Sequence, residues 1–292
     1  MSGLCWGTTS LGSRYLAHFR GVSPGVTVFW RFALAAPLLF AACRLWGRKE
    51  PRFEWRDLPK IAGLSAVGIF LMSNLSFYAV RYTTNINVTI IMTASAVLIG
   101  LIAFLGGTKV TKRQWVAIAT GLLGVGFITI AMNRHERDFS VWAHMGGVGL
   151  ATLGSLSWAV YTVYGGPMVA KYGGLRTTAW AIWIGVIMQA PVALLGGAGQ
   201  APKGGDWAVL VYLGVVPTAL AFTTWFMALK YVDVTTLGMT QYVGPILNAT
   251  LAWLLLGERI LWMHVAGAAL IFAGLHFASR PTYRGGENSG NL

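Results

Sequence analysis

Amide and hydroxyl side chains recur at helical spacing within otherwise apolar stretches of the sequence. Asn85, Thr89 and Thr93 lie four positions apart, and Asn74 and Tyr78 repeat that spacing. Residues four apart share one face of an α-helix, so each set aligns hydrogen-bonding groups along a helix. This pattern predicts a binding surface for neutral or zwitterionic small molecules. The alternative is that these side chains join neighbouring helices by hydrogen bonds inside a membrane.

Aromatic and amide residues extend this candidate binding surface. The additional candidates are Trp6, Trp158, Tyr161, Trp225, Gln241 and Tyr242. Trp158 and Tyr161 are three positions apart, which places them on one helical face. We expect these side chains to line a path for a substrate. An aromatic belt at the membrane surface is the alternative for the tryptophans and tyrosines.

Acidic groups are scarce, and their positions limit the chemistry. Every Asp and Glu lies in a connection, at a helix end or in the C-terminal tail. We therefore expect no catalytic residue, no metal site and no cofactor, and a substrate without net positive charge. The residues left for coupling or gating are Arg31, Pro245, Glu258 and His264. For Arg31 the alternative is a side chain that reaches back to the membrane surface.

The composition indicates that the segments carrying these residues are embedded in a membrane. Of the 292 residues, 55% are hydrophobic and 11% are charged, whereas a soluble domain carries about 25% charged residues. In a soluble protein the formal net charge of +13 would indicate nucleic-acid binding. Here we expect the basic residues in loops beside membrane spans, with lipid and a small-molecule substrate as partners and no nucleic acid.

Apolar runs divide the chain into candidate membrane-spanning helices, each of which needs about 20 residues. The runs are 2–18, 24–45, 59–80, 84–106, 113–132, 144–170, 175–196, 206–229, 234–256 and 261–279. The sixth run contains Gly165, Gly166 and Pro167, so we expect it to kink or to end early. None of the runs alternates apolar and polar residues as the strands of a membrane β-barrel do. The sequence therefore predicts an all-α integral membrane protein with ten transmembrane helices.

Basic residues in the connections predict the orientation of these helices, because Lys and Arg are retained on the cytoplasmic side. The connection between the second and third runs is the most basic. It carries Arg44, Arg48, Lys49, Arg52, Arg56 and Lys60. We therefore expect both termini in the cytoplasm, with the protein in the inner membrane of a bacterium.

The second half of the chain repeats the first. Phe77–Tyr82 matches Phe226–Tyr231 at an offset of 149 positions, and Leu4–Trp6 matches Leu156–Trp158. Each half holds an odd number of runs, so the second half inserts upside down relative to the first. Inverted repeats are typical of transporters, which bind their substrates near the membrane midplane between the halves.

The repeat also predicts the domain organisation. We expect two inverted five-helix repeats, the first at 1–138 and the second at 139–282. Residues 283–292 follow as a cytoplasmic tail. The binding site is expected between helices of the two repeats.

The chain also resembles the EamA-type transporters of the drug/metabolite transporter superfamily, over nearly its whole length as two repeats. The residues that carry the resemblance are Trp6-Gly7, Pro24 with Arg31, Pro245, Leu254–Glu258 and Gly267–Gly274. The first half departs from the pattern at Ala96, where the repeat has proline, and at Thr108-Lys109, where it has Gly-Glu. The resemblance implies ten helices, inverted repeats and a central cavity that moves small metabolites, often outward.

These observations together predict a transporter that works by alternating access. We expect it to export an amino acid or a related neutral or zwitterionic compound, and we expect no enzymatic activity. The rival interpretation is a polytopic membrane enzyme that acts at the membrane surface. Such an enzyme requires clustered His, Asp or Glu at one surface, and the scattered acids of this sequence favour transport.

Overall fold

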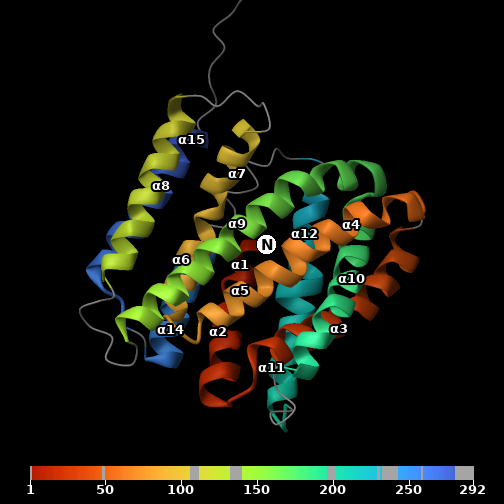
Figure 1. Cartoon of the computed structure of the whole chain (residues 1–292), viewed down its shortest axis with the longest axis horizontal. Helices are drawn as coiled ribbons and strands as arrows, with labels where there is room; N and C mark the ends of the chain where they lie inside the picture. The colour runs from red at the N-terminus through yellow and green to blue at the C-terminus, as the bar shows by residue number, and fades with distance from the viewer. Residues whose placement is uncertain are drawn as a thin grey trace, which may run out of the picture.

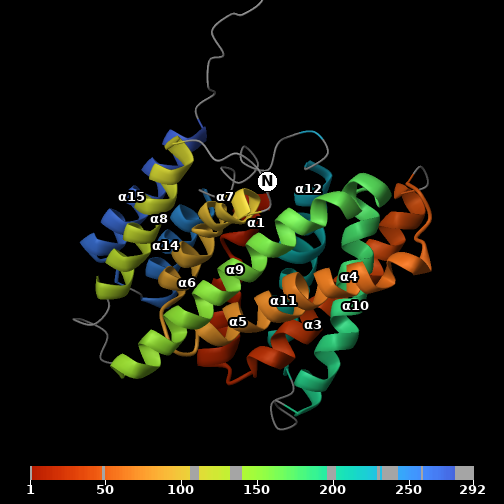
Figure 2. The same ribbon diagram turned by 45° about the horizontal axis from the view of Figure 1, so that its top comes forward.

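The computed structural model describes residues 2–47, 50–105, 112–131, 140–195, 202–228, 231, 243–257 and 259–279. Within these ranges the chain is mostly helical, with short turns between the helices, and no residue belongs to a β-strand. Figures 1 and 2 show the helices packed side by side, with α8 and α15 at one edge and α3 and α10 at the other.

The helical elements fall into two series along the chain. The first comprises α1 (Ser2–Trp6), α2 (Thr9–Arg14), η1 (Tyr15–Phe19), α3 (Pro24–Leu45), η3 (Trp55–Asp57), α4 (Leu58–Ser65), η4 (Ala66–Leu71), α5 (Met72–Ala79), α6 (Asn85–Thr93), α7 (Ser95–Leu105) and α8 (Lys112–Ala131). The second comprises α9 (Val141–Tyr172), α10 (Gly174–Leu195), α11 (Asp206–Gly214), η6 (Val215–Leu220), α12 (Ala221–Ala228), α14 (Val243–Leu256) and α15 (Trp262–Ser279). Each of the ten predicted apolar runs contains helix among its described residues.

Several helices are suited to a lipid environment. Five helical stretches of the described chain are long and apolar enough to cross a membrane: Pro24–Leu45, Trp55–Ala79, Asn85–Ile102, Gly174–Leu195 and Asp206–Ala228. Large apolar side chains are also exposed on the outside of the bundle, among them Leu123, Ile187, Leu254 and Val265. Exposed apolar surface on this scale is a liability in water but is satisfied by lipid.

Helix α9 corrects one prediction. The sixth run was expected to kink or to end early; the early end is wrong, because the helix continues through Gly165, Gly166 and Pro167 to Tyr172. Proline removes one backbone donor. The residues beyond it, Met168, Val169 and Tyr172, are buried in the main core cluster, and this burial offsets the lost hydrogen bond. The helix ends instead at Gly173, whose φ of 80° suits glycine.

Two helices share an interruption by a π-helical segment. η4 divides Trp55–Ala79, and η6 divides Asp206–Ala228. The segments Ala66–Leu71 and Val215–Leu220 are 149 positions apart, the offset at which the two halves of the sequence match. Within η6, Pro217 has no N–H, so one helical hydrogen bond is lost at this point. Single π-helical segments recur at functional sites, because they redirect side chains and free carbonyl groups.

Candidate functional site

A cavity of about 120 Å³ lies between elements from the two halves of the chain. Its lining residues are Trp6, Gly7, Thr9, Ser10, Ser13, Arg31, Met72, Ser76, Phe77, Val88, Thr89, Met92, Thr93, Trp158, Phe222 and Gly244. Figure 1 shows α1, α5, α6 and α9, which contribute many of these residues, meeting near the middle of the molecule. The cavity unites five of the predicted site residues: Trp6, Arg31, Thr89, Thr93 and Trp158.

Aromatic rings form one wall of this cavity. The ring centroids of Trp6 and Trp158 are 5.1 Å apart in an edge-to-face arrangement, and Phe222 lies 5.7 Å from Trp6. The Trp6 Nε1–H donates to the Pro217 carbonyl at 3.0 Å, which fixes the orientation of the indole. Predicted residues Trp225 and Tyr161 are fully buried behind this wall, 5.8 Å from Trp158. They support the wall without lining the cavity.

Hydroxyl groups form a second wall. Ser10 Oγ and Thr89 Oγ1 share a hydrogen bond of 2.6 Å, which joins α2 to α6. Thr93 lies one turn beyond Thr89 on α6 and donates to its carbonyl at 2.9 Å. Predicted residue Asn85 lies behind them and donates to Asn248 Oδ1 at 2.7 Å. Asn248 in turn donates to Ser10 Oγ at 3.1 Å, so two buried amides hold the hydroxyl wall in place.

Close contact between backbones brings the two walls together. A Cβ atom added to Gly7 would lie 2.7 Å from the carbonyl oxygen of Gly244 in α14. Only glycine permits so short a distance between the turn after α1 and α14. Gly7 and Gly244 both line the cavity, so the backbones of the two segments are in direct contact at the cavity wall.

Arg31 is the charged residue among the described residues of the lining. It is 3% exposed, and its Nε–H donates to Thr218 Oγ1 at 2.9 Å. Its guanidinium carbon lies 4.8 Å from the ring centre of Phe32 and 5.0 Å from that of Phe77. These contacts bury the cation inside the bundle, so the side chain does not reach the membrane surface.

Asn74 and Tyr78, predicted as a pair, lie outside the cavity lining. Asn74 exchanges hydrogen bonds of 2.6 and 3.1 Å with Gln189 of α10. Gln189 also donates to the carbonyl of Gly25 at 3.2 Å. The hydroxyl of Tyr78 lies beside the same glycine at the start of α3. In this structure Asn74 joins helices, which is the alternative use of membrane-buried amides.

The remaining predicted residues fall elsewhere or outside the described residues. His264 is buried near the start of α15, where its Nδ1 accepts the Leu261 N–H at 3.1 Å. Pro245 belongs to α14. Gln241, Tyr242 and Glu258 lie outside the described residues.

Sequence reasoning missed several lining residues, of which Ser10, Ser13 and Phe222 are examples. Trp6, Ser10 and Ser13 are spaced by four and three positions, so the helical-face argument used for Asn85, Thr89 and Thr93 would have found them. No sequence signal distinguishes Phe222 from the many other apolar residues, because only the packing of α12 against α1 brings it to the cavity.

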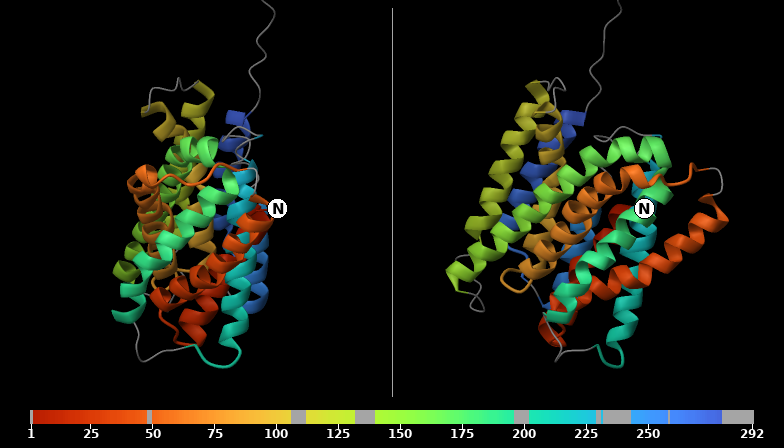
Figure 3. Two further views of the ribbon diagram at one scale, coloured as in Figure 1. Left: turned by 90° about the vertical axis from the view of Figure 1, so that its right-hand side faces the viewer. Right: turned by 45° about the vertical axis from the view of Figure 1, so that its right-hand side comes forward.

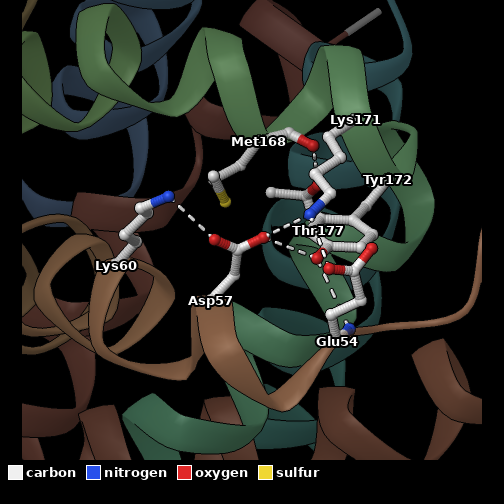
Figure 4. Close-up of polar contacts among 7 residues, drawn as sticks. All are labelled: Glu54, Asp57, Lys60, Met168, Lys171, Tyr172 and Thr177. Carbon is white, nitrogen blue, oxygen red and sulfur yellow. Dashed lines mark hydrogen bonds and ion pairs between the residues drawn. The ribbon is translucent and has the colours of Figure 1, made fainter.

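Charged side chains join the two halves at one end of the bundle (Figure 4). Asp57 Oδ2 accepts from Lys171 Nζ and from the Tyr172 hydroxyl, each at 2.7 Å, and Asp57 Oδ1 accepts from Lys60 at 2.9 Å. Glu54 also pairs with Lys171 at 3.0 Å. Hydrogen bonds from Lys171 to Asp57 and Glu54 raise the pKa of the Lys171 ammonium above its ordinary value. We call these five residues the Asp57 network.

A simpler ion pair joins the two halves at the other end. Arg20 Nε donates to Asp206 Oδ1 at 2.7 Å, and Asp206 Oδ2 accepts the Lys203 N–H at 2.9 Å. Figure 3 shows the start of α11 and the end of η1 at one end of the bundle, whereas the corner between α9 and α10 lies towards the other. Asp57 and Asp206 are 149 positions apart, so the two carboxylates are equivalent in the repeat.

Comparison with known proteins places this chain among transporters. A model of the EamA-like transporter family matches residues 1–130 and 145–280. An "Uncharacterized transporter" of Archaeoglobus fulgidus is 31% identical over 265 residues, which cover 88% of each chain. A protein of Streptantibioticus cattleyicolor named "Probable terminal-alkyne amino-acid exporter" is 27% identical over 255 residues, which cover 86% of this chain and 82% of that protein.

A solved crystal structure shares the fold. It superposes with a TM-score of 0.71 at 22% sequence identity and covers 95% of this chain and 93% of the other. The family match spans both halves, and the predicted resemblance is confirmed. The helical, lipid-suited architecture agrees with it. The chain is an integral membrane protein that belongs to the EamA-like transporter family.

Proposed function

We propose that this protein exports a small metabolite, an amino acid or a related neutral or zwitterionic compound, by alternating access. The observation that carries the proposal is the cavity, which draws its lining from both halves of the chain. Its small volume suits a metabolite, since pockets for drug-sized ligands are roughly 300–1,000 Å³. Rings on one wall and hydroxyls on the other provide for an apolar and a polar part of one molecule.

We further propose that ten helices form two inverted five-helix repeats, at 1–138 and 139–282, with both termini and the 283–292 tail in the cytoplasm of a bacterium. Two features at the repeat offset of 149 positions support this arrangement: the π-helical segments η4 and η6, and the carboxylates Asp57 and Asp206. Each carboxylate also pairs with a base whose connection the proposed topology puts on the same side of the membrane.

The two charged ends then act as gates. The Asp57 network closes the cytoplasmic end, and the Arg20–Asp206 pair closes the opposite end. Alternating access requires that the halves separate at one end at a time. The bases of these pairs suit this role, because the side chains of Arg20 and Lys171 are 43% and 42% exposed and water solvates them when the pairs separate.

An amino-acid-like substrate has a second line of support. The relative named as an amino-acid exporter aligns with 86% of this chain. This chain itself matches the EamA-like transporter family. Among the residues that the structure describes, the cavity lining holds no acidic side chain, so a purely cationic compound finds no counter-ion from them. This favours a neutral, zwitterionic or anionic molecule.

Transport by the purified protein tests the proposal. We expect proteoliposomes loaded with a mixture of unlabelled amino acids to take up a labelled amino acid by exchange. Trp158→Ala should reduce this uptake at least tenfold, whereas Trp142→Ala, an 86% exposed residue at the start of α9, should leave it unchanged. Absence of uptake for every metabolite would overturn the proposal. Recovery of a chemically altered compound would instead support the membrane-enzyme alternative.

A further inference from the structure

Arg31 is set deep in the bundle by a chain of hydrogen bonds that begins at a proline. Pro217 lacks an N–H, so the Leu213 carbonyl has no helical donor from that position. The Thr218 hydroxyl fills this place and donates to the Leu213 carbonyl at 2.6 Å. Its oxygen then accepts the Arg31 Nε–H at 2.9 Å. With its hydrogen donated to Leu213, the hydroxyl can only accept, and it holds the Arg31 guanidinium at the cavity wall.

The cation has no acidic partner there. Among the described residues, no salt bridge joins Arg31 to a carboxylate, and no other lining residue is charged. A guanidinium has five N–H donors, and Nε uses one of them on Thr218. A charge buried in this way is costly unless an anion or water meets it.

The second arginine buried near the cavity shows the contrast. Arg14 of α2 donates to the carbonyl oxygens of Val80 and Thr83, at 3.5 and 3.0 Å, and so joins α2 to the turn after α5. It does not line the cavity. Arg14 therefore has a structural role, whereas the arrangement around Arg31 leaves its Nη groups for a ligand.

We propose that Arg31 binds the carboxylate of the transported molecule. The substrate is then a small carboxylic acid or amino acid whose apolar part lies against the aromatic wall of Trp6, Trp158 and Phe222. A guanidinium fork matches a carboxylate with two parallel hydrogen bonds, which gives orientation as well as affinity. This inference rests on the proposed transport function and adds to it the substrate group that is recognised.

Ligand-induced thermal stabilisation of the purified wild-type protein tests the inference without requiring transport. The probes form two matched sets: leucine, 4-methylpentanoate, leucinamide and isopentylamine, and the corresponding four compounds derived from phenylalanine. We expect carboxylates of at least one set to raise Tm, and the amides and amines to have no effect. Stabilisation by an amide equal to that by its acid, or no stabilisation by any carboxylate, would overturn the inference.

Variants locate the effect at Arg31. Arg31→Gln should weaken carboxylate binding by about ten- to hundredfold, since a charge-assisted hydrogen-bonding group is lost. Arg31→Lys keeps the charge but loses the fork and should weaken binding to a smaller extent. Thr218→Val removes the hydroxyl that orients the guanidinium and should also weaken carboxylate binding. Arg44→Gln, exposed on the same helix, is the control and should bind as the wild type does.

The outcomes separate this inference from the transport proposal. Uptake of a metabolite that is equally fast in wild type and in folded Arg31→Gln overturns the carboxylate assignment and leaves transport standing. If Arg31→Gln fails to fold, unchanged carboxylate binding in both Arg31→Lys and Thr218→Val overturns the assignment in the same way. Absence of uptake by the wild type, with carboxylate binding present, overturns transport and leaves the binding site.

Discussion

The helices Trp55–Ala79 and Asp206–Ala228 are built to one plan with different chemistry. Each begins with a buried carboxylate that pairs with the other half of the chain, and each is interrupted by a π-helical segment at the same place. At equivalent positions of these segments the first helix has Gly68 and the second has Pro217. The comparison separates what the architecture requires from what each half adds.

Gly68 and Pro217 serve opposite needs. A Cβ added to Gly68 would overlap the ring of Tyr161, so this glycine lets α9 pack tightly against the first helix. Pro217 instead changes the hydrogen bonding of its own helix, and Thr218 uses the change to hold Arg31. The first helix therefore closes the core, and the second positions the charge at the cavity.

The two charged ends of the bundle also differ, in the number of partners that each carboxylate has. The Asp57 network depends on lysines and has several partners, whereas Asp206 has one arginine and one backbone N–H. More partners hold a carboxylate in place more firmly. We infer that the Asp57 end is the harder of the two to open.

The largest effect is expected at Gly68. Gly68→Ala should lower the free energy of unfolding by about 1–3 kcal/mol, because the added methyl group forces the buried ring of Tyr161 to move. The gain in helix propensity, about 1 kcal/mol at most, does not offset this. Thermal unfolding in detergent measures the change.

Gly63→Ala is the matched control, since nothing lies within 4 Å of a Cβ at Gly63. It should be neutral or slightly stabilising. Combining Gly68→Ala with Tyr161→Ala should cost less than the sum of the single changes. Fully additive losses would show that the ring does not fill the space beside Gly68.

A smaller effect is expected from neutralising the two carboxylates in turn. Asp57→Asn should raise amide hydrogen exchange severalfold at residues 52–60 and 168–177, because the ion pairs across that end are lost. Asp206→Asn should raise exchange less, and at the opposite end. Equal effects of the two variants would contradict the ranking of the ends.

The smallest effect is expected when Lys171 is replaced by arginine. The raised pKa of Lys171 means that its pairing stabilises the fold fully below the ordinary lysine pKa of about 10.4. This stabilisation is lost as pH rises through the higher pKa of the folded state. The Tm of the wild type should therefore fall more as pH rises above about 10.4 than that of Lys171→Arg, which stays charged. An equal fall in both proteins would show that Lys171 does not stabilise this end.

Prediction from sequence was accurate where one segment contained its own signal. The run 24–45 became α3 with the same bounds, since Pro24 begins the helix and an apolar stretch of bilayer length follows it. It was inaccurate where a signal was local but its consequence was not. Gly165, Gly166 and Pro167 were expected to kink this run or to end it early, yet α9 continues to Tyr172 because the residues beyond Pro167 are buried in the core.

The candidate site shows the same limit. Asn74 and Thr89 are polar residues of apolar helices, and the sequence treats them alike. Only the structure shows that Asn74 faces Gln189 of α10 while Thr89 faces Ser10 at the cavity. The partner of a polar group is a property of two helices, so one helix cannot reveal it.

The sequence by itself determined the solvent and the scaffold of this protein. Its apolar runs require lipid, its offset of 149 positions relates the two halves, and none of its acids lies in the interior of an apolar run. Tertiary structure decided which polar groups meet at the cavity and which residue carries the charge there. The physical reason is that burial and pairing of Arg31 depend on Thr218 and Phe77, which lie far away in the chain and are brought to it only by packing.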